Sequence, residues 1–197
     1  MKDYPWPEPC VPHASKELAH AIGVININWN WCEFLLEHIL GTYIGTQQRV
    51  ADRLISPLGA RTRCDILTGL VKELETDDAR AKCVLHFIAC FDICRENRNL
   101  LTHGLCVDEY PDLDGPALVS HKAAIDIFDR AAPVSVDLLL TTINETRTLF
   151  EFGFGIIDAG YLGADDQPEP LPKKPPLPRK LTKLLPAQII ERLQPES

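Results

Sequence analysis

Apolar side chains recur at spacings of three and four residues along most of the chain, which is the period of an amphipathic helix. The clearest example carries Ile22, Ile25, Trp29, Cys32, Leu36 and Ile39. It predicts a helix that begins after Ser15 and ends near Gly41 or Gly45, because serine caps helix starts and glycine ends helices. The same period predicts further helices at about 47–55, 58–74, 77–103 and from 134 to 153 or beyond.

Between the fourth and fifth predicted helices, turn-forming residues separate two short apolar pieces of residues 105–120. This segment predicts a loose β-hairpin or an irregular loop. Gly104 is expected to end the fourth helix in a left-handed conformation, and Gly153 and Gly155 are expected to end the fifth. The predicted fold class is therefore all-α: an up-and-down helical bundle of four to five helices with a small hairpin or loop insertion after the fourth helix.

Proline-rich segments flank the predicted helical domain, residues 14–164. Residues 1–13 hold four prolines and predict an extended arm. Residues 165–197 form a Pro-rich, locally basic C-terminal tail that we expect to be a solvated spacer. Within it, Pro175-Pro176-Leu177-Pro178-Arg179-Lys180 has the PxxP pattern followed by basic residues, which an SH3-like groove would bind.

Composition narrows the classes of function. The net charge of −8 argues against broad, non-specific binding of nucleic acid but leaves room for a small basic cleft. No apolar run is as long as a membrane span and the first residues hold no apolar signal core, so a cytoplasmic protein without membrane contact is expected. The seven cysteines are odd in number and mostly sit in apolar helical pattern, which indicates reduced, buried thiols.

No metal or cofactor site is expected. Cys83, His86, Cys90 and Cys94 share one helical stripe, but at about 1.5 Å per residue the outer two lie roughly 16 Å apart, too far to bind one ion. Nucleotide-binding glycine motifs are also missing from the sequence.

The candidate chemistry lies in residues 95–104, Arg-Glu-Asn-Arg-Asn-Leu-Leu-Thr-His-Gly. His103 is the side chain suited to proton transfer near neutral pH, and Arg98 offers a permanently charged fork for phosphate oxygens. Asn99 could orient either group, and Arg95 is an accessory candidate. The competing interpretation is a helix end, in which His103 caps the helix and the arginines interact with its dipole. The residues alone leave both interpretations open.

Helix geometry makes a prediction about assembly. Five residues turn an ideal helix through about 500°, so Arg98 and His103 point roughly 140° apart and one helix cannot bring them together. Two protomers related by a two-fold axis could bring an arginine and a histidine together in a composite site, and this predicts a homodimer. On the first helix, Asn26, Asn30, Glu33 and Glu37 form a polar stripe that is either a wall of this cleft or a solvated face. Asn30 and Glu33 are accessory candidates.

Residues 98–103, Arg-Asn-Leu-Leu-Thr-His, resemble the Rx4-6H motif of HEPN domains in its form with a four-residue spacer. Trp29, Asn30 and Glu33 are similar to a Trp and Glu pattern in the first helix of many such proteins. The resemblance covers about residues 15–160 as architecture and is specific over about ten residues. It implies a dimeric helical bundle and, in active members, a metal-independent endoribonuclease of a toxin or defence system, with Arg98 and His103 catalytic and Asn99 supportive.

The resemblance also permits two other functions. One is a non-catalytic HEPN-like helical module that serves interaction or assembly. The other is a nucleotide-binding accessory subunit that works with a nucleotidyltransferase. RNA is the expected substrate of the enzyme, and an antitoxin is a further candidate partner.

Overall fold

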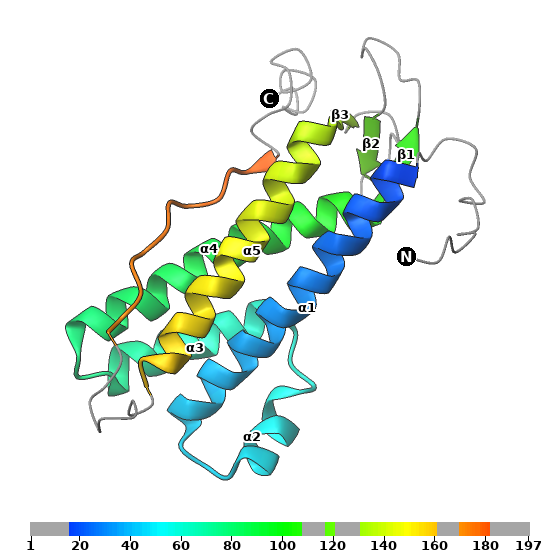
Figure 1. Cartoon of the computed structure of the whole chain (residues 1–197). Coiled ribbons are helices and arrows are strands. Elements are labelled where there is room, and N and C mark those ends of the chain that lie inside the picture. Colours follow the sequence, from blue (N-terminus) through cyan, green and yellow to red (C-terminus); the bar gives the residue numbers. More distant parts are fainter. Residues whose placement is uncertain (1–15, 108–116, 121–130, 161–169, 182–197) are drawn as a thin grey trace, which may run out of the picture. The chain divides into compact units, whose positions relative to one another are not determined.

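The computed structural model describes residues 16–107, 117–120, 131–160 and 170–181 (Figure 1). Its helices are α1 (Lys16–Ile44), α2 (Gln48–Ile55), α3 (Ala60–Leu74), α4 (Asp78–His103) and α5 (Val136–Asp158). Its strands are β1 (Gly104–Val107), β2 (Ala117–Ser120) and β3 (Ala131–Pro133). The predicted all-α class is confirmed. The predicted arm, residues 1–13, lies outside the described residues.

Local capping explains where the helices begin and end. Gly45 follows α1 with φ of 66°, a conformation that glycine adopts without strain, which confirms one of the two predicted ends. Asp77 Oδ1 accepts a hydrogen bond from the N–H of Ala79 at 2.8 Å and so caps α4. Ser135 Oγ accepts one from the N–H of Leu138 at 3.1 Å, so α5 begins two residues later than predicted.

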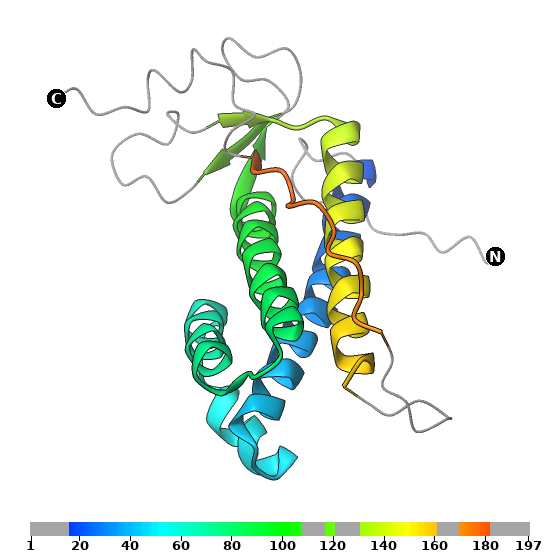
Figure 2. The same cartoon turned by 90° about the vertical axis from the view of Figure 1, so that its left-hand side faces the viewer.

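The insertion after α4 is a three-stranded antiparallel sheet in the order β1-β2-β3 (Figure 2). The predicted hairpin corresponds to β1 and β2, which place Gly104 opposite Ser120. One prediction is wrong here, and one strand was missed. Gly104 is the first residue of β1 and not a left-handed helix cap, and β3 was not predicted because three residues are too few to display an alternating pattern. Pro133 lies on this edge strand, where a missing N–H costs least.

Chain contacts divide the protein into two compact units. The motif unit comprises Met1–Asn26, Glu96–Ile143 and Lys180–Ser197, and the main unit comprises Ile27–Arg95 and Asn144–Arg179. Each unit thus receives parts of α1, α4 and α5 and has its own buried cluster. The cluster of the motif unit contains Leu18, Ala21, Ile25, Leu101, Val134, Leu139 and Leu181.

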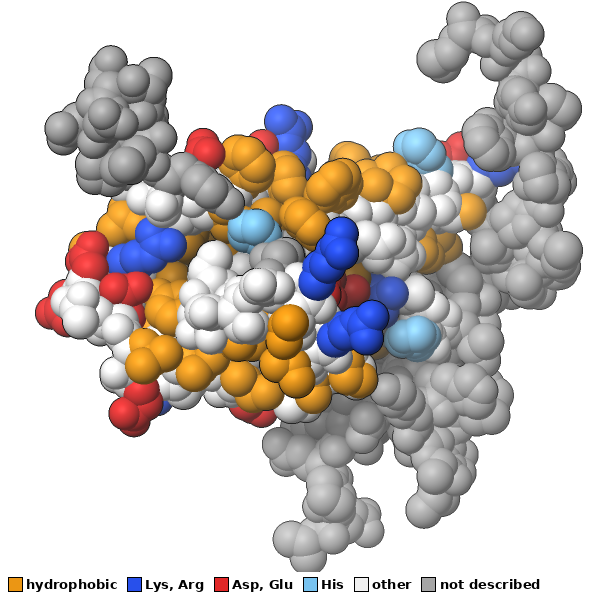
Figure 3. Space-filling model, turned by 90° about the horizontal axis from the view of Figure 1, so that it is seen from below, with side chains coloured by type: hydrophobic (Ala, Val, Ile, Leu, Met, Phe, Trp, Pro, Cys, Tyr) orange, Lys and Arg blue, Asp and Glu red, His pale blue; other side chains and the backbone are white. Residues whose placement is uncertain are grey.

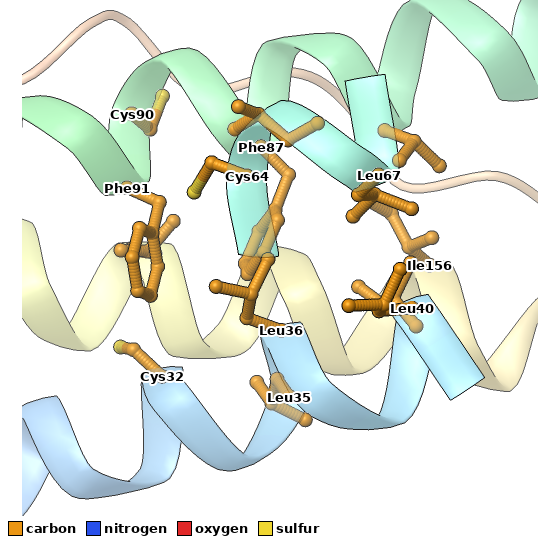
Figure 4. Close-up of a cluster of buried hydrophobic side chains, with 14 of the residues drawn as sticks. Cys32, Leu35, Leu36, Leu40, Cys64, Leu67, Phe87, Cys90, Phe91 and Ile156 are labelled. Atoms are coloured by element: carbon orange, nitrogen blue, oxygen red, sulfur yellow. The ribbon is translucent and has the colours of Figure 1, made fainter. Parts of the chain in front are cut away.

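The core of the main unit is aromatic and rich in cysteine. The rings of Trp29 and Phe91 lie 4.5 Å apart between centroids, and both side chains are buried. Figure 4 shows the thiols of Cys32, Cys64 and Cys90 among leucine and phenylalanine side chains of the same cluster. These cysteines act as small hydrophobic residues, in agreement with the expectation of reduced, buried thiols.

A buried arginine links three helices of the main unit. Arg63 of α3 is 9% exposed and pairs with Glu37 of α1 at 2.5 Å. Its Nε and Nη2 donate to the carbonyl oxygens of Ile55 and Ser56, at the end of α2. The buried guanidinium is therefore both neutralised and hydrogen-bonded, as a buried charge requires.

Two glycines expected to end α5 lie inside it, because neighbouring side chains occupy the space that a Cβ would need. A Cβ on Gly153 would be 2.5 Å from Phe87 Cε2 and 3.1 Å from Leu35 Cδ1. A Cβ on Gly155 would be 2.9 Å from Pro172 Cβ. The prediction that these glycines terminate the helix is wrong, and close packing explains their presence.

The part of the proline-rich tail that the structure describes, residues 170–181, is here called the strap. It runs beside α5 in Figures 1 and 2, and the carbonyl oxygen of Pro175 lies 2.7 Å from His86 Nε2 of α4. The backbone N–H of Arg179 donates to Glu145 Oε1 at 3.1 Å. In the motif unit, Leu181 is 3% exposed. The expectation of a solvated spacer is therefore wrong for these residues.

The main unit also exposes aromatic rings between α1 and α5. Trp31 and Phe34 are each 53% exposed and Phe154 is 51% exposed. The ring centroid of Phe150 lies 6.1 Å from those of Trp31 and Phe154, and the ring of Trp31 also contacts that of Phe34. These contacts are edge to face or tilted. Figure 3 shows one face of the molecule, on which hydrophobic side chains lie among charged ones. Among the described residues, no helix is both long and apolar enough to cross a membrane.

Candidate phosphate-binding site around Arg98

The ten-residue stretch singled out by the sequence forms the last turns of α4, and its first three residues have structural partners. Arg95, in the main unit, lies 3.4 Å from Asp92 Oδ1. Glu96 pairs with Lys180 of the strap at 3.3 Å. Asn97 is buried, and its Oδ1 accepts the N–H of Leu181 at 3.0 Å. Glu96 and Asn97 thus bind the strap to α4, whereas the contact between Arg95 and Asp92 lies within α4 itself.

Arg98 is different, because its partners are neutral. Its Nε donates to Asn26 Oδ1 at 3.1 Å, and its Nη1 donates to Asn99 Oδ1 at 3.2 Å. Across the described parts of the chain, no carboxylate lies within ion-pair distance of this half-buried guanidinium. Hydrogen bonds therefore orient the guanidinium, and no described carboxylate neutralises its charge.

Asn26 is itself held by the helix to which it belongs. Its Nδ2 donates to the carbonyl oxygen of Ile22 at 2.9 Å, one turn earlier in α1. This bond turns Oδ1 toward α4, where it accepts from Arg98 and, at 3.4 Å, from Thr102 Oγ1. A guanidinium has only donors, so an amide must face it with its oxygen.

The group around Arg98 retains hydrogen-bond donors that its described contacts do not use. A guanidinium has five N–H groups, of which Arg98 uses one on Nε and one on Nη1 for its described contacts. The remaining donors are on Nη1 and Nη2, the terminal edge of the fork. Asn99, whose oxygen faces Arg98, has its amide N–H₂ left to donate. An anion with several oxygens, such as a phosphodiester, matches this arrangement.

His103 is the last residue of α4, and its side chain is exposed. It is not among the side chains that contact Arg98 in the described part of the motif unit. The structure therefore brings Asn26 and Asn99 to Arg98 and Thr102 to Asn26, while His103 lies five residues further along the same helix as Arg98. The divergence of about 140° on an ideal helix is consistent with this separation.

The predicted polar stripe of α1 has no single role. Asn26 contacts Arg98 in the motif unit, whereas Glu37 neutralises buried Arg63 in the main unit. The accessory candidates Asn30 and Glu33 also belong to the main unit, where Asn30 is exposed and Glu33 is half-buried. Of the stripe, only Asn26 is shown to contact a predicted catalytic residue, and it was not among the predicted site residues. The contact joins positions 72 residues apart, which helical period cannot reveal.

The buried cysteines offer no reactive thiol at neutral pH. Burial raises the pKa of Cys64 to about 12 and that of Cys90 to about 11. Burial and the nearby charge of Glu33 raise the pKa of Cys32 to about 12. These thiols stay protonated near neutral pH and are poor nucleophiles and poor metal ligands. Within the described residues, no three His, Cys, Asp or Glu side chains are grouped so that they could hold a metal ion.

Comparisons with protein-family models, with curated proteins and with solved structures gave no match. A function for the site therefore has to be argued from its own residues.

Proposed function

We propose that this chain is a HEPN-like, metal-independent endoribonuclease of a cytoplasmic toxin or defence system. The observation that carries the proposal is Arg98, a half-buried guanidinium that is held by two amide oxygens and has no described carboxylate partner. A structural arginine usually neutralises a carboxylate, as Arg63 does with Glu37. An oriented arginine that has unused donors and no carboxylate partner among the described residues is suited to a phosphodiester.

The chemistry follows from the side chains of α4. Neutral His103 takes the proton from a ribose 2′-hydroxyl, and the 2′-oxygen attacks the adjacent phosphorus. Arg98 and the amide of Asn99 stabilise the negative charge that develops on the non-bridging oxygens. The P–O5′ bond breaks, and the leaving oxygen is protonated by an imidazolium. The products are a 2′,3′-cyclic phosphate and a 5′-hydroxyl end.

A homodimer completes the site in this proposal. Because Arg98 and His103 diverge on one helix, a second protomer related by a two-fold axis supplies the matching group. RNA is the substrate. An antitoxin or a nucleotidyltransferase is the candidate partner of the protein in this system.

The test is cleavage of RNA by purified protein in the presence of EDTA. We expect wild-type protein to cleave, with 2′,3′-cyclic phosphate ends, and both His103→Ala and Arg98→Ala to lose about 10²–10⁴-fold in rate. EDTA is expected to change nothing, because arginine and histidine supply the charge stabilisation and proton transfer that a metal would. RNA left intact by the wild type, or cleaved equally by both variants, overturns the proposal in favour of a non-catalytic interaction module.

A further inference from the structure

We propose that Asn26 is a positioning residue of this site and that its neutral charge is required for binding of the phosphodiester. The inference rests on the proposed function. Asn26 does not touch the reacting atoms in this scheme. It acts through Arg98, whose Nε it holds at 3.1 Å.

The orientation of Asn26 is fixed from both sides. On the α1 side, its Nδ2 is bonded to the carbonyl oxygen of Ile22. On the α4 side, its Oδ1 receives two donors, from Arg98 and from Thr102 one turn later. The amide thus has one arrangement that satisfies all three contacts, and that arrangement holds the Nε edge of the guanidinium.

This arrangement determines which edge of Arg98 meets the substrate. With Nε bonded to Asn26, a phosphate can be bound in a bidentate manner only at the terminal Nη1 and Nη2 edge. The oxygen of Asn99 is bonded to Nη1, so its amide belongs to the same group of side chains as that edge. Arg98 and Asn99 then supply the donors for the anion, while Asn26 holds the guanidinium from its Nε edge.

The identity of residue 26 matters because aspartate has the same shape as asparagine. The chain holds 28 Asp and Glu against 20 Lys and Arg, yet both side-chain oxygens that face Arg98 belong to amides. An aspartate at position 26 could accept the same bond from Nε and would neutralise the guanidinium. The neutral amide therefore orients Arg98 and leaves its charge for the ligand.

Two substitutions separate orientation from charge. Asn26→Asp keeps the shape and adds a carboxylate that pairs with Arg98. Asn26→Ala removes the oxygen and adds no charge. Asn144→Asp is the matched control, because it makes the same chemical change at an exposed asparagine of α5 in the main unit.

Binding is measured with an RNA that carries 2′-O-methyl groups and cannot be cleaved. Asn26→Asp is expected to weaken binding about tenfold or more and to lower the slope of log K against log salt by about 0.7, the value for one lost phosphate contact on a single strand. Asn26→Ala is expected to slow cleavage of unmodified RNA about tenfold while the salt slope stays near that of the wild type. Thermal unfolding should show that both variants remain folded.

A second measurement does not depend on RNA. The ¹⁵Nε–Hε resonance of Arg98, identified by its loss in Arg98→Lys, is expected to exchange slowly with water in the wild type and faster in Asn26→Ala. Equal exchange in the two proteins overturns the positioning role, whether or not RNA is bound. If the wild type binds RNA and Asn26→Asp binds as Asn144→Asp does, the charge requirement is wrong while the proposed function stands. If the wild type neither binds nor cleaves RNA, the proposed function fails and with it the charge requirement.

Discussion

Asn97 Oδ1 accepts the backbone N–H of Leu181 at 3.0 Å, although the two residues are 84 positions apart. This hydrogen bond fixes the last residue of the strap in the motif unit, where the side chain of Leu181 is buried in the small apolar cluster. A buried amide with this partner satisfies a backbone donor that no helix or strand would otherwise bond. The strap is therefore part of the folded protein.

The strap yields a prediction with an internal control. Leu181→Ala should lower the free energy of unfolding by about 2 kcal/mol or more, because it removes a side chain that is 3% exposed and leaves a cavity. Leu177→Ala, four residues earlier, should change it by less than about 0.5 kcal/mol, because that leucine is 54% exposed. Urea unfolding measures both. Equal effects of the two substitutions would contradict the docked strap.

Close packing at Gly153 yields a second prediction. Gly153→Ala should destabilise the protein by about 1–3 kcal/mol, because its Cβ would lie 2.5 Å from the buried ring of Phe87. Gly69→Ala is the control in an exposed position of α3, where nothing lies within 4 Å of the added Cβ. It should stabilise by up to about 1 kcal/mol, since alanine favours helix. A Gly153→Ala protein as stable as the wild type would refute the close packing of the Phe87 ring against position 153.

These examples show what the sequence could and could not predict. Helical period located the five helices and placed α2 within one residue, because each buries an apolar stripe that recurs in the sequence. Gly153 and Gly155 were misjudged because their role depends on Phe87 and Pro172, which are distant in sequence. Composition marked the strap as proline-rich, but its docking depends on single contacts such as that of His86 with the carbonyl of Pro175.

The same limit applies to the candidate site. Residue chemistry selected Arg98 and Asn99, and the structure joins them by a hydrogen bond. The sequence placed Asn26 on a polar stripe but could not indicate that it faces Arg98 across two helices. Arg95 and Glu96 were part of the same conspicuous stretch, yet each has an oppositely charged partner. Charge and spacing alone cannot separate a residue that binds a ligand from one that forms an ion pair.

Tyr43 predicts a loss of stability at alkaline pH. Burial, with a hydrogen bond to Glu75 and the charge of that carboxylate, raises the pKa of Tyr43 from 10.0 to about 12. Between these values the unfolded chain releases the phenolic proton and the folded protein keeps it. The raised pKa of Tyr43 therefore stabilises the folded protein in full below about pH 10, and this stabilisation is lost as the pH rises toward about 12.

The buried thiols, whose pKa values are also raised, make the stability depend on pH from about pH 9 upward. Comparison with the Tyr43→Phe variant separates the effect of Tyr43 from theirs, because both proteins keep the thiols. We expect the difference in unfolding free energy between wild type and Tyr43→Phe to shrink as the pH rises from 9.5 to 11.5, measured by urea unfolding at each pH. A difference that is constant over this window would show that Tyr43 ionises alike in the folded and unfolded chain.

The last prediction concerns the composite site of the proposed ribonuclease. If each site takes Arg98 from one protomer and His103 from the other, a heterodimer of Arg98→Ala and His103→Ala chains has one site with both groups and one with neither. Two inactive chains, co-expressed and allowed to pair at random, should therefore regain about a quarter of wild-type cleavage. Purification through two different affinity tags isolates the heterodimer, which should regain about half. A mixture of the separately folded variants is the control and should stay inactive while subunits do not exchange. If the wild type cleaves RNA and the purified heterodimer does not, one chain must supply both Arg98 and His103. Light scattering that finds only monomers in an active preparation would lead to the same conclusion.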